Sequence, residues 1–558
     1  MKTQSSTKIL FFILAIALLL RLLASMEGLP AVYNSTEQYL AKYTLKMAAN
    51  RTIDPEFYIY PPFYQYILIL LYTAYYFIGL AAGIFKDQYD FAIAFLLNPS
   101  WFYGLGRILS LMLSLYSVIL IYNFVRRIYN PAVALLGAGI TAFSYHLFLF
   151  NRYATHESLL VFFTIIAICK YYDILLSDRK PDIFWAAVAT GLAIAAKYNA
   201  GLLIFGFFLV IYMRYKLSPA ELIKAFGIVI IVFLLVNPAI LTNPINFWKG
   251  FQIIVTQSHS GVISKQSIPY WWEIKEIISR EMIIGIVFFA ALIFAMFRRS
   301  RYDLVLLSII LPTLIYVGSW SKKGIDYILV CWPPLIILSC GFINNIWQRW
   351  QLSERIKYYS LLIILVPSFL YTVYASVLVV LPDTRKLASE WILQNRKPSE
   401  KVCYDKNGYD LYFFDIDRFT KYGPNAANLP EPVKIRLQQY KNLRQQVPMV
   451  QTIRYQSDLL SDSVALDYHK IQAAIYWKSL DEIKAEGARW LIVNHSDSDL
   501  YTLEQPNLMP AVLRRIKKMR LFYSQLETDY QPRIQFNPGI WRAGPLISIY
   551  FLNEPNPD

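Results

Sequence analysis

ILFFILAIALLLRLL, residues 9–23, contains one charged residue, Arg21, and with its flanks is about as long as one bilayer-crossing helix. No convincing small-residue cleavage site follows it, so the stretch is predicted to stay in place as a signal-anchor helix. Lys2 and Lys8 precede it and are expected on the inner side of the membrane. The sequence therefore begins as that of a membrane protein.

The rest of the chain repeats this pattern. It is 56% hydrophobic and 16% charged, whereas soluble domains carry about 25% charged residues. Further apolar runs of spanning or near-spanning length lie at 61–85, 101–125, 131–150, 158–176, 184–213, 222–242, 282–298, 303–319, 325–346 and 357–381. The expected fold is mainly α: a polytopic transmembrane helical bundle of about 11 spans over residues 1–382, followed by a smaller domain.

The distribution of charge predicts the topology of the bundle. The net charge is +16; residues 383–558 contribute 24 − 21 = +3, so residues 1–382 contribute 30 − 17 = +13. A positive excess among apolar spans indicates cytoplasmic loops rather than nucleic-acid binding. Basic clusters follow several runs, at Arg126-Arg127, Arg179-Lys180, Arg214 with Lys216, Arg298-Arg299 with Arg301, and Arg355 with Lys357. If all are cytoplasmic, the outer loops are 26–60, 151–157, 243–281 and 320–324.

This topology holds only if the run 61–85 does not cross the membrane. The run is crowded with Tyr and Phe, which prefer the level of the lipid headgroups, so it is predicted to lie along the outer interface. The alternative is an ordinary span with a compensating break elsewhere, because its length alone is sufficient.

The run 184–213 is too long for one helix, short for two, and closed by basic residues at both ends. Lys197-Tyr198-Asn199 sits in its middle, which predicts two short helices meeting at that triplet. An ammonium group at membrane depth is costly unless it is paired or faces a cavity, so Lys197 is a functional candidate.

After Pro382 charged and apolar residues alternate in short blocks. LDEIKAEGARWLIVN (480–494) predicts an amphipathic helix, a glycine turn and a buried strand, and PLISIYFLN (545–553) a closing strand. Residues 383–558 are therefore expected to form one soluble, extracytoplasmic α/β domain. Its D-x-D pairs at 415–417 and 497–499 lack a nucleotide-binding glycine loop, so no cofactor is predicted, and a divalent metal stays an alternative that the sequence does not support.

Acidic residues are scarce in the membrane half, which makes their positions informative. Glu37 and Glu157 lie in the first and second predicted outer loops, Arg152 is beside Glu157, and Asp54 follows Glu37. Carboxylates and cations that converge at one membrane face form a plausible site. The alternative is that both glutamates are solvated loop residues.

Several short motifs, in order over about residues 8–380, resemble the C-type (GT-C) membrane glycosyltransferases, in the branch of the protein O-mannosyltransferases and lipid A aminoarabinose transferases. They are Arg21, TEQY (36–39), DPEFYIYPP (54–62), GLGR (104–107), RYATHESLLVFF (152–163), GLAIAAKYN (191–199), NPAIL (237–241) and SHSG (258–261). The family usually has Asp-Glu where this chain has Thr36-Glu37, and Asp where this chain has Glu157.

The resemblance implies an inverting glycosyltransferase at the outer face of the cell membrane, with a polyprenyl-phosphate-linked sugar donor and an unknown acceptor. A phosphate leaving group needs no proton, so one general base suffices; Glu37 is the first choice and Glu157 the second. Lys197, Arg152, Lys322 and Lys323 are candidates for binding the donor phosphate, although the last two could equally snorkel beside Trp320. Further candidates are Asp54, Tyr60, Arg107, Tyr198 and His259.

Two alternatives remain open. A transporter or glycolipid flippase would also place charges near membrane depth, but transporters often show paired, similarly broken halves. A catalytically degenerate family member kept as a scaffold is suggested by Thr36, which stands where the family has an acid.

Overall fold

The computed structural model describes most of the membrane half and part of the C-terminal domain. The described residues are 3–176, 181–215, 219–260, 270–320, 322–397, 399–404, 414–415, 435, 449–450, 452–454, 456–458, 475–495 and 510–553.

The membrane half is built of helices. In chain order they are α1 (Thr3–Ala24), α2 (Ser35–Ala49), α3 (Phe63–Ala81), α4 (Gln88–Leu97), α5 (Ser100–Ile128), α6 (Pro131–Phe143), α7 (Tyr145–Asn151), α8 (Glu157–Leu176), α9 (Pro181–Ala196), η1 (Tyr198–Leu202), α10 (Leu203–Arg214), α11 (Pro219–Leu235), α12 (Ala239–Thr242), α13 (Pro244–Ser260), α14 (Trp271–Glu281), α15 (Ile283–Arg298), α16 (Arg301–Gly318), η2 (Ile325–Tyr327), η3 (Leu329–Cys331), α17 (Trp332–Arg349) and α18 (Glu354–Val380).

Each predicted apolar run forms helix. Among the described residues, seven helices are long and apolar enough to cross a membrane, or eight if the bent pair α6–α7 counts as one span, and shorter apolar helices accompany them. Helices satisfy their backbone hydrogen bonds internally, which is the condition for crossing lipid. The multi-pass helical architecture expected from the sequence is confirmed.

Two spans are broken. α9 ends at Ala196 and η1 begins at Tyr198, so the predicted break at Lys197 is confirmed. The run 131–150, expected to be continuous, instead bends by 51° between α6 and α7. Ser144 causes this break: its backbone leaves helical geometry, and its hydroxyl accepts the N–H of Leu147 to start α7.

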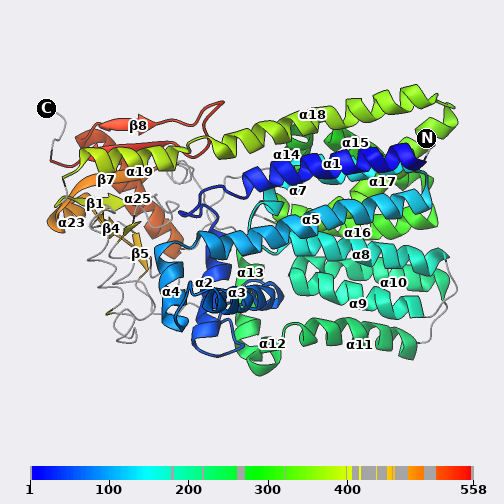
Figure 1. Ribbon diagram of the computed structural model, residues 1–558, viewed down its shortest axis with the longest axis horizontal. Coiled ribbons are helices and arrows are strands. Elements are labelled where there is room, and N and C mark those ends of the chain that lie inside the picture. The colour runs from blue at the N-terminus through cyan, green and yellow to red at the C-terminus, as the bar shows by residue number, and fades with distance from the viewer. Residues whose placement is uncertain are drawn as a thin grey trace.

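Helix α3 does not run alongside the bundle helices. In Figure 1, α5, α8 and α9 lie lengthwise across the view, whereas α3 is foreshortened and lies with α2 and α4 at the end of the bundle nearest the sheet. Its aromatic side chains pack onto the first turns of α5, where Tyr72 meets Phe102 with ring centroids 5.4 Å apart. By length and composition α3 could still cross a membrane, so its position along the interface stays a prediction.

The C-terminal domain contains a five-stranded mixed sheet of order β4-β1-β7-β9-β8. The strands are β1 (Lys401–Tyr404), β4 (Thr452–Arg454), β7 (Ala488–Asn494), β8 (Ile534–Phe536) and β9 (Ile547–Phe551). Short pairs join β2 (Phe414–Asp415) with β3 (Met449–Val450), and β5 (Gln456–Asp458) with β6 (Ile475–Trp477). The helix–turn–strand predicted for 480–494 is confirmed as α23 (Leu480–Ala485), Gly487 at φ +86° and β7, and the closing strand is β9.

Helices cover both faces of this sheet. On one face α19 (Thr384–Asn395) buries Ala388 and Ile392 against the strands. On the other, α23 and α25 (Pro510–Asp529) bury side chains such as Leu480 and Phe522. α19 follows α18 after three residues, so the chain passes directly from the last bundle helix into this domain.

The bundle therefore has two unlike ends. Figure 1 shows the sheet at one end, named the domain end here, and the N-terminus at the opposite end. α5 and α15 both end at that opposite end of the bundle. Their last turns are basic and contain Arg126, Arg127 and Arg298. The positive-inside rule, applied to this arrangement, predicts that the domain end is extracytoplasmic.

Candidate functional site

A buried cluster of charges lies at the break between α9 and η1. Lys197 Nζ donates to Glu157 Oε1 at 3.0 Å, to Asp326 Oδ2 at 3.0 Å and to the Asp326 carbonyl oxygen at 3.1 Å. The side chains of Lys197 and Glu157 are only 3% and 6% exposed, whereas that of Asp326 is 23% exposed. We call Glu157, Lys197, Lys322, Asp326 and Tyr327 the Lys197 cluster.

Three members of the Lys197 cluster, namely Lys197, Glu157 and Asp326, lie at helix ends or in a short helix. Lys197 precedes the first turn of η1, with extended backbone. Glu157 begins α8, where a carboxylate is stabilised by the helix dipole. Asp326 lies in η2, and its Oδ1 would be 2.5 Å from a Cβ at residue 324, a position that Gly324 leaves free. The break in the span brings a cation at membrane depth to its two carboxylate partners.

Lys322 is the second cation of this cluster. Its Nζ lies 5.4 Å from the centre of the Tyr327 ring, as does that of Lys197. Among the described residues it forms no ion pair, and burial lowers the pKa of its ammonium from the usual value, an effect that nearby Asp326 opposes. Lys322 is therefore the less neutralised of the two lysines.

Polar and aromatic side chains extend the cluster toward α2. The Tyr60 ring packs against that of His156 with centroids 4.3 Å apart, and the Thr36 side chain is a neighbour of its hydroxyl. Burial raises the pKa of Tyr60 to about 12 and lowers that of His156 to about 4, so both are uncharged near neutral pH. His156 Nε2 lies 3.3 Å from Glu157 Oε1. Thr36 thus lies beside Tyr60, at the edge of the Lys197 cluster.

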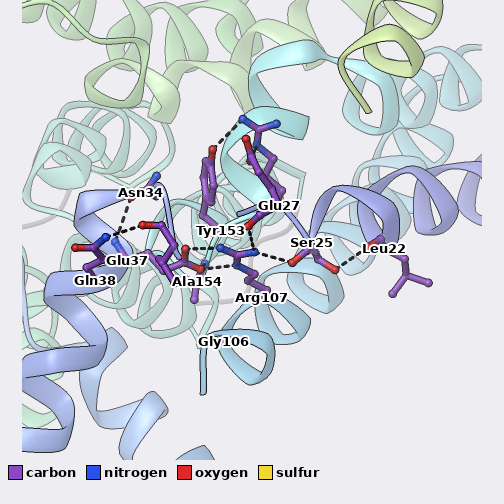
Figure 2. Close-up of polar contacts among 12 residues, drawn as sticks. Leu22, Ser25, Glu27, Asn34, Glu37, Gln38, Gly106, Arg107, Tyr153 and Ala154 are labelled. Atoms are coloured by element: carbon purple, nitrogen blue, oxygen red, sulfur yellow. Dashed lines mark hydrogen bonds and ion pairs between the residues drawn. The ribbon is translucent and has the colours of Figure 1, made fainter. Parts of the chain in front are cut away.

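Glu37 belongs to a second buried group. Figure 2 shows its carboxylate facing the guanidinium of Arg107, with Nε–Oε1 and Nη2–Oε2 distances of 2.7 Å. Oε1 also accepts the backbone N–H of Ala154 at 2.7 Å. Arg107 Nη1 donates to the carbonyl oxygens of Ser25 and Glu27. Both charged side chains are completely buried.

Arg152 completes this second group. Its Nε lies 3.0 Å from Glu27 Oε2, and its Nη2 donates to the Tyr153 hydroxyl at 2.8 Å. The side chains of Arg152 and Glu27 are each 11% exposed. We call Glu27, Glu37, Arg107, Arg152 and Tyr153 the Glu37–Arg107 cluster; it ties the chain after α1, the first turn of α2, α5 and the 152–157 loop together.

The other predicted site residues fall in different places. Lys323 pairs with Glu273 at 2.8 Å. Asp54 accepts the Tyr58 hydroxyl and the Asn243 side-chain amide, both at 2.7 Å, and so organises its own loop. Tyr198 donates to the Tyr58 carbonyl oxygen. The side chain of His259 lies outside the described residues, as do Asp417, Asp497 and Asp499 of the D-x-D pairs.

Sequence reasoning missed Asp326. It lies just beyond the predicted outer loop 320–324, at the start of the run 325–346, where it was counted as part of an apolar segment. Its sequence context could have identified it as a candidate, because this acid closely follows Lys322-Lys323 and a glycine at the edge of a predicted span. Over the part of the chain that the structure describes, no group of three or more His, Cys, Asp or Glu side chains could hold a metal ion.

The chain is similar in sequence to a known protein family and to a curated protein. The pattern of the family described as dolichyl-phosphate-mannose-protein mannosyltransferase matches residues 104–241. An uncharacterized protein from Aquifex aeolicus is 25% identical over 273 residues, 48% of this chain. The chain spans about half, 52%, of the length of that curated relative.

Solved structures share the fold over nearly the whole chain. ArnT from Cupriavidus metallidurans in the apo state aligns with a TM-score of 0.54 at 11% identity, covering 99% of this chain and 100% of ArnT. ArnT bound to undecaprenyl phosphate gives 0.50 at 12% identity, covering 97% of each chain. The archaeal oligosaccharyltransferase AglB from Archaeoglobus fulgidus gives 0.50 at 9% identity, covering 96% of this chain and 74% of AglB. The fold expected from the sequence motifs is confirmed.

Proposed function

We propose that this chain, which has the fold of the C-type membrane glycosyltransferases, transfers a sugar from a polyprenyl-phosphate-linked donor to an acceptor at the outer membrane face. The match of residues 104–241 to a dolichyl-phosphate-mannose-dependent family supports a lipid-phosphate donor. The structures of ArnT with undecaprenyl phosphate and of AglB with dolichol phosphate support the same class. The donor sugar is a hexose or pentose, and the acceptor is a lipid, a glycan or a protein.

The observation that carries the proposal is the Lys197 cluster. A lysine buried between two carboxylates stands at a helix break at the domain end, and one of those carboxylates is partly exposed. Charged groups within spanning segments are costly and are usually retained for function. A lipid-linked donor enters from the bilayer while its acceptor comes from outside, and this end of the bundle is where the two could meet.

In the proposed reaction the acceptor oxygen or nitrogen attacks the anomeric carbon from the side opposite the phosphate, so the configuration inverts. The bond from that carbon to the phosphate oxygen breaks, and polyprenyl phosphate leaves with the bonding electrons. We assign Asp326 as the base that takes the acceptor proton, because it is the most exposed carboxylate of the cluster and Lys197 engages only its Oδ2.

The cations take different roles in this scheme. Lys197 faces two carboxylates, so its charge is already balanced and it serves mainly to hold Asp326 and Glu157 in place. Lys322, which has no carboxylate partner among the described residues, is free to meet the donor phosphate. Glu157, the second-choice base, positions Lys197.

Glu37 receives a new assignment in this proposal. Its two oxygens accept three hydrogen bonds, two from Arg107 and one from Ala154, and the side chain is inaccessible. A general base must reach the acceptor proton within hydrogen-bond distance. We propose that Glu37 instead positions the 152–157 loop, and therefore Glu157, through Arg107 and Ala154.

The chain is proposed to reside in the cell membrane with its C-terminal domain outside. The transporter alternative is not favoured, because the shared fold is that of ArnT and AglB. The degenerate-scaffold alternative makes a different prediction, namely that substitutions in the Lys197 cluster leave glycosylation unchanged.

Mass spectrometry of the glycolipids, surface polysaccharide and glycoproteins of a deletion strain tests the proposal. We expect at least one glycan to disappear and to return with the wild-type gene. Complementation with Lys197→Ala should fail, whereas Lys170→Ala should succeed; Lys170 pairs with Asp173 on α8 and is 35% exposed.

Two outcomes distinguish failure of the proposed activity from failure of the proposed site. An unchanged glycan profile in the deletion strain would remove the glycosyltransferase proposal. A lost glycan that folded Lys197→Ala restores would keep the activity and reject the Lys197 cluster as its site.

A further inference from the structure

The tip of the β8–β9 hairpin presents large apolar side chains to the exterior. Gly539 and Arg542 exchange two backbone hydrogen bonds of 3.1 Å, which close a tight turn with Ile540 and Trp541 at its tip. These two side chains are 73% and 65% exposed. Figure 1 shows the hairpin reaching back from the sheet toward α18. A soluble domain gains nothing in water from an exposed Ile-Trp pair on a protruding turn.

The tip rests on a bundle helix. The Tyr374 hydroxyl of α18 donates to the Ile540 carbonyl oxygen at 2.5 Å, and the Tyr374 and Trp541 rings meet edge to face with centroids 5.7 Å apart. Residues 370, 374 and 377 share one helix face. Leu370 and Val377 on that face are 58% and 41% exposed. The hairpin tip therefore lies beside an apolar stripe of α18 that faces away from the protein.

The depth of this contact can be gauged along α18. Lys357, at its start, is a charged residue expected at the inner surface. At about 1.5 Å per helical residue, Tyr374 lies about 26 Å further along the axis, and the hydrocarbon core is about 30 Å thick. Tyr374 therefore falls near the outer rim of that core, the level at which Trp and Tyr are enriched.

We propose that the tip of the β8–β9 hairpin, with Ile540 and Trp541 at its end, is a membrane-interface anchor of the C-terminal domain. Its partner is the headgroup layer of the outer leaflet: Ile540 and Trp541 enter beside α18, and exposed Arg542 meets lipid phosphates. The anchor is independent of the proposed transferase activity. It would hold the domain over the bundle at a second point besides the α18–α19 connection.

Spin labelling in lipid nanodiscs tests the anchor. The full chain carries Cys169→Ser, which removes the half-buried native cysteine; Cys331, Cys340 and Cys403 are buried. A nitroxide is placed through Ile540→Cys in one sample and through Glu486→Cys in the other. Glu486 is a matched control because it is an exposed residue of the same domain, next to the turn before β7.

Collisions with oxygen, which concentrates in lipid, are compared with collisions with a water-soluble nickel chelate. We expect a higher oxygen-to-nickel ratio at residue 540 than at 486, and a fall of that ratio at 540 when the same protein is moved from nanodiscs into a non-lipid polymer. A label at 540 as accessible to nickel as the control would overturn the proposal. A label at 540 shielded from both reagents would also overturn it, in favour of a protein contact, and Trp541→Cys repeats the measurement one residue on.

Discussion

Lys197 is the central residue of the proposed site, because its ammonium group is shared between the carboxylates of Glu157 and Asp326. Removing one partner of a buried ion pair leaves an uncompensated charge and typically costs about 3–5 kcal/mol of stability. We therefore expect Lys197→Met to lower both the melting temperature and the turnover per folded molecule. Lys197→Arg should retain stability better than activity, because it keeps the charge but changes the geometry.

Turnover and thermal unfolding of purified Lys197 variants check this expectation, with Lys170→Met as the control. The control removes a partly exposed lysine that pairs with Asp173, and pairs of this kind contribute little to stability. Unaltered turnover in folded Lys197→Met would reduce Lys197 to a structural residue.

The two carboxylates Asp326 and Glu37 give the sharpest comparison at the residue scale. Asp326→Asn cannot take a proton, so turnover should fall roughly 10²–10⁴-fold with donor binding largely retained. Glu37→Gln breaks the buried bidentate pair with Arg107, so it should lower the melting temperature and the folded yield more than the rate per folded molecule. Normal turnover in Asp326→Asn together with a slow, stable Glu37→Gln would return the base to Glu37.

At the scale of elements, the break between α6 and α7 is held by Glu281 from α14. Its Oε1 accepts the Ser144 hydroxyl at 2.7 Å, the His146 N–H at 3.0 Å and the His146 ring at 2.8 Å, and its Oε2 accepts the Tyr145 N–H at 3.2 Å. α7 leads directly into the 152–157 loop with Glu157. We therefore expect Glu281 to act as a positioning residue for the proposed site, through α7 and the 152–157 loop, without contacting the Lys197 cluster itself.

Glu281→Gln should destabilise the protein by about 1–3 kcal/mol, the cost of leaving buried donors poorly satisfied. It should also lower turnover, because the 152–157 loop shifts with α7. Glu276→Gln is the control: this residue lies 3.7 Å from His146 and its side chain is 29% exposed. Denaturant unfolding and transfer assays check both, and equal behaviour of the two variants would contradict the positioning role.

Cysteine labelling on either side of α3 can show whether this helix lies along the membrane interface or crosses the membrane. Ile53 and Lys86 flank the helix and are exposed. If α3 lies along the outer interface, a cysteine introduced at either position should react with a membrane-impermeant maleimide in intact cells. If α3 spans the membrane, only one of the two will react. Lys8→Cys serves as the inner-side control, because exposed Lys8 lies at the start of the first predicted span and its predicted side does not depend on α3.

At the scale of the whole molecule, the topology predicts that the sheet domain is outside. Alkaline phosphatase fused after Asp558 should be active, and green fluorescent protein fused there by the general export route should stay dark. The same reporters fused after Arg127, at the end of α5, should give the opposite result. Fluorescence of the Asp558 fusion would invert the assignment of both ends of the bundle and remove the outer-face site.

The sequence by itself determined the helical bundle and the α/β domain. Lipid offers no hydrogen bonds to the backbone, so apolar runs of spanning length have to become helices. The same reasoning located the break at Lys197, because a charge in the middle of a long apolar run needs a partner. It also singled out Glu157 and Lys197 as candidate site residues, and the structure brings the two side chains within 3.0 Å of each other.

Only the tertiary structure decided which partner each charge has. Lys197 meets Asp326, 129 positions away, and Glu37 meets Arg107, 70 positions away. Such pairs depend on how helices distant in the chain pack, and neither local periodicity nor spacing contains that information. Burial then separates two acids that look alike in sequence: the Glu37 carboxylate accepts three hydrogen bonds and is completely buried, whereas the Asp326 side chain is 23% exposed and Lys197 contacts only its Oδ2.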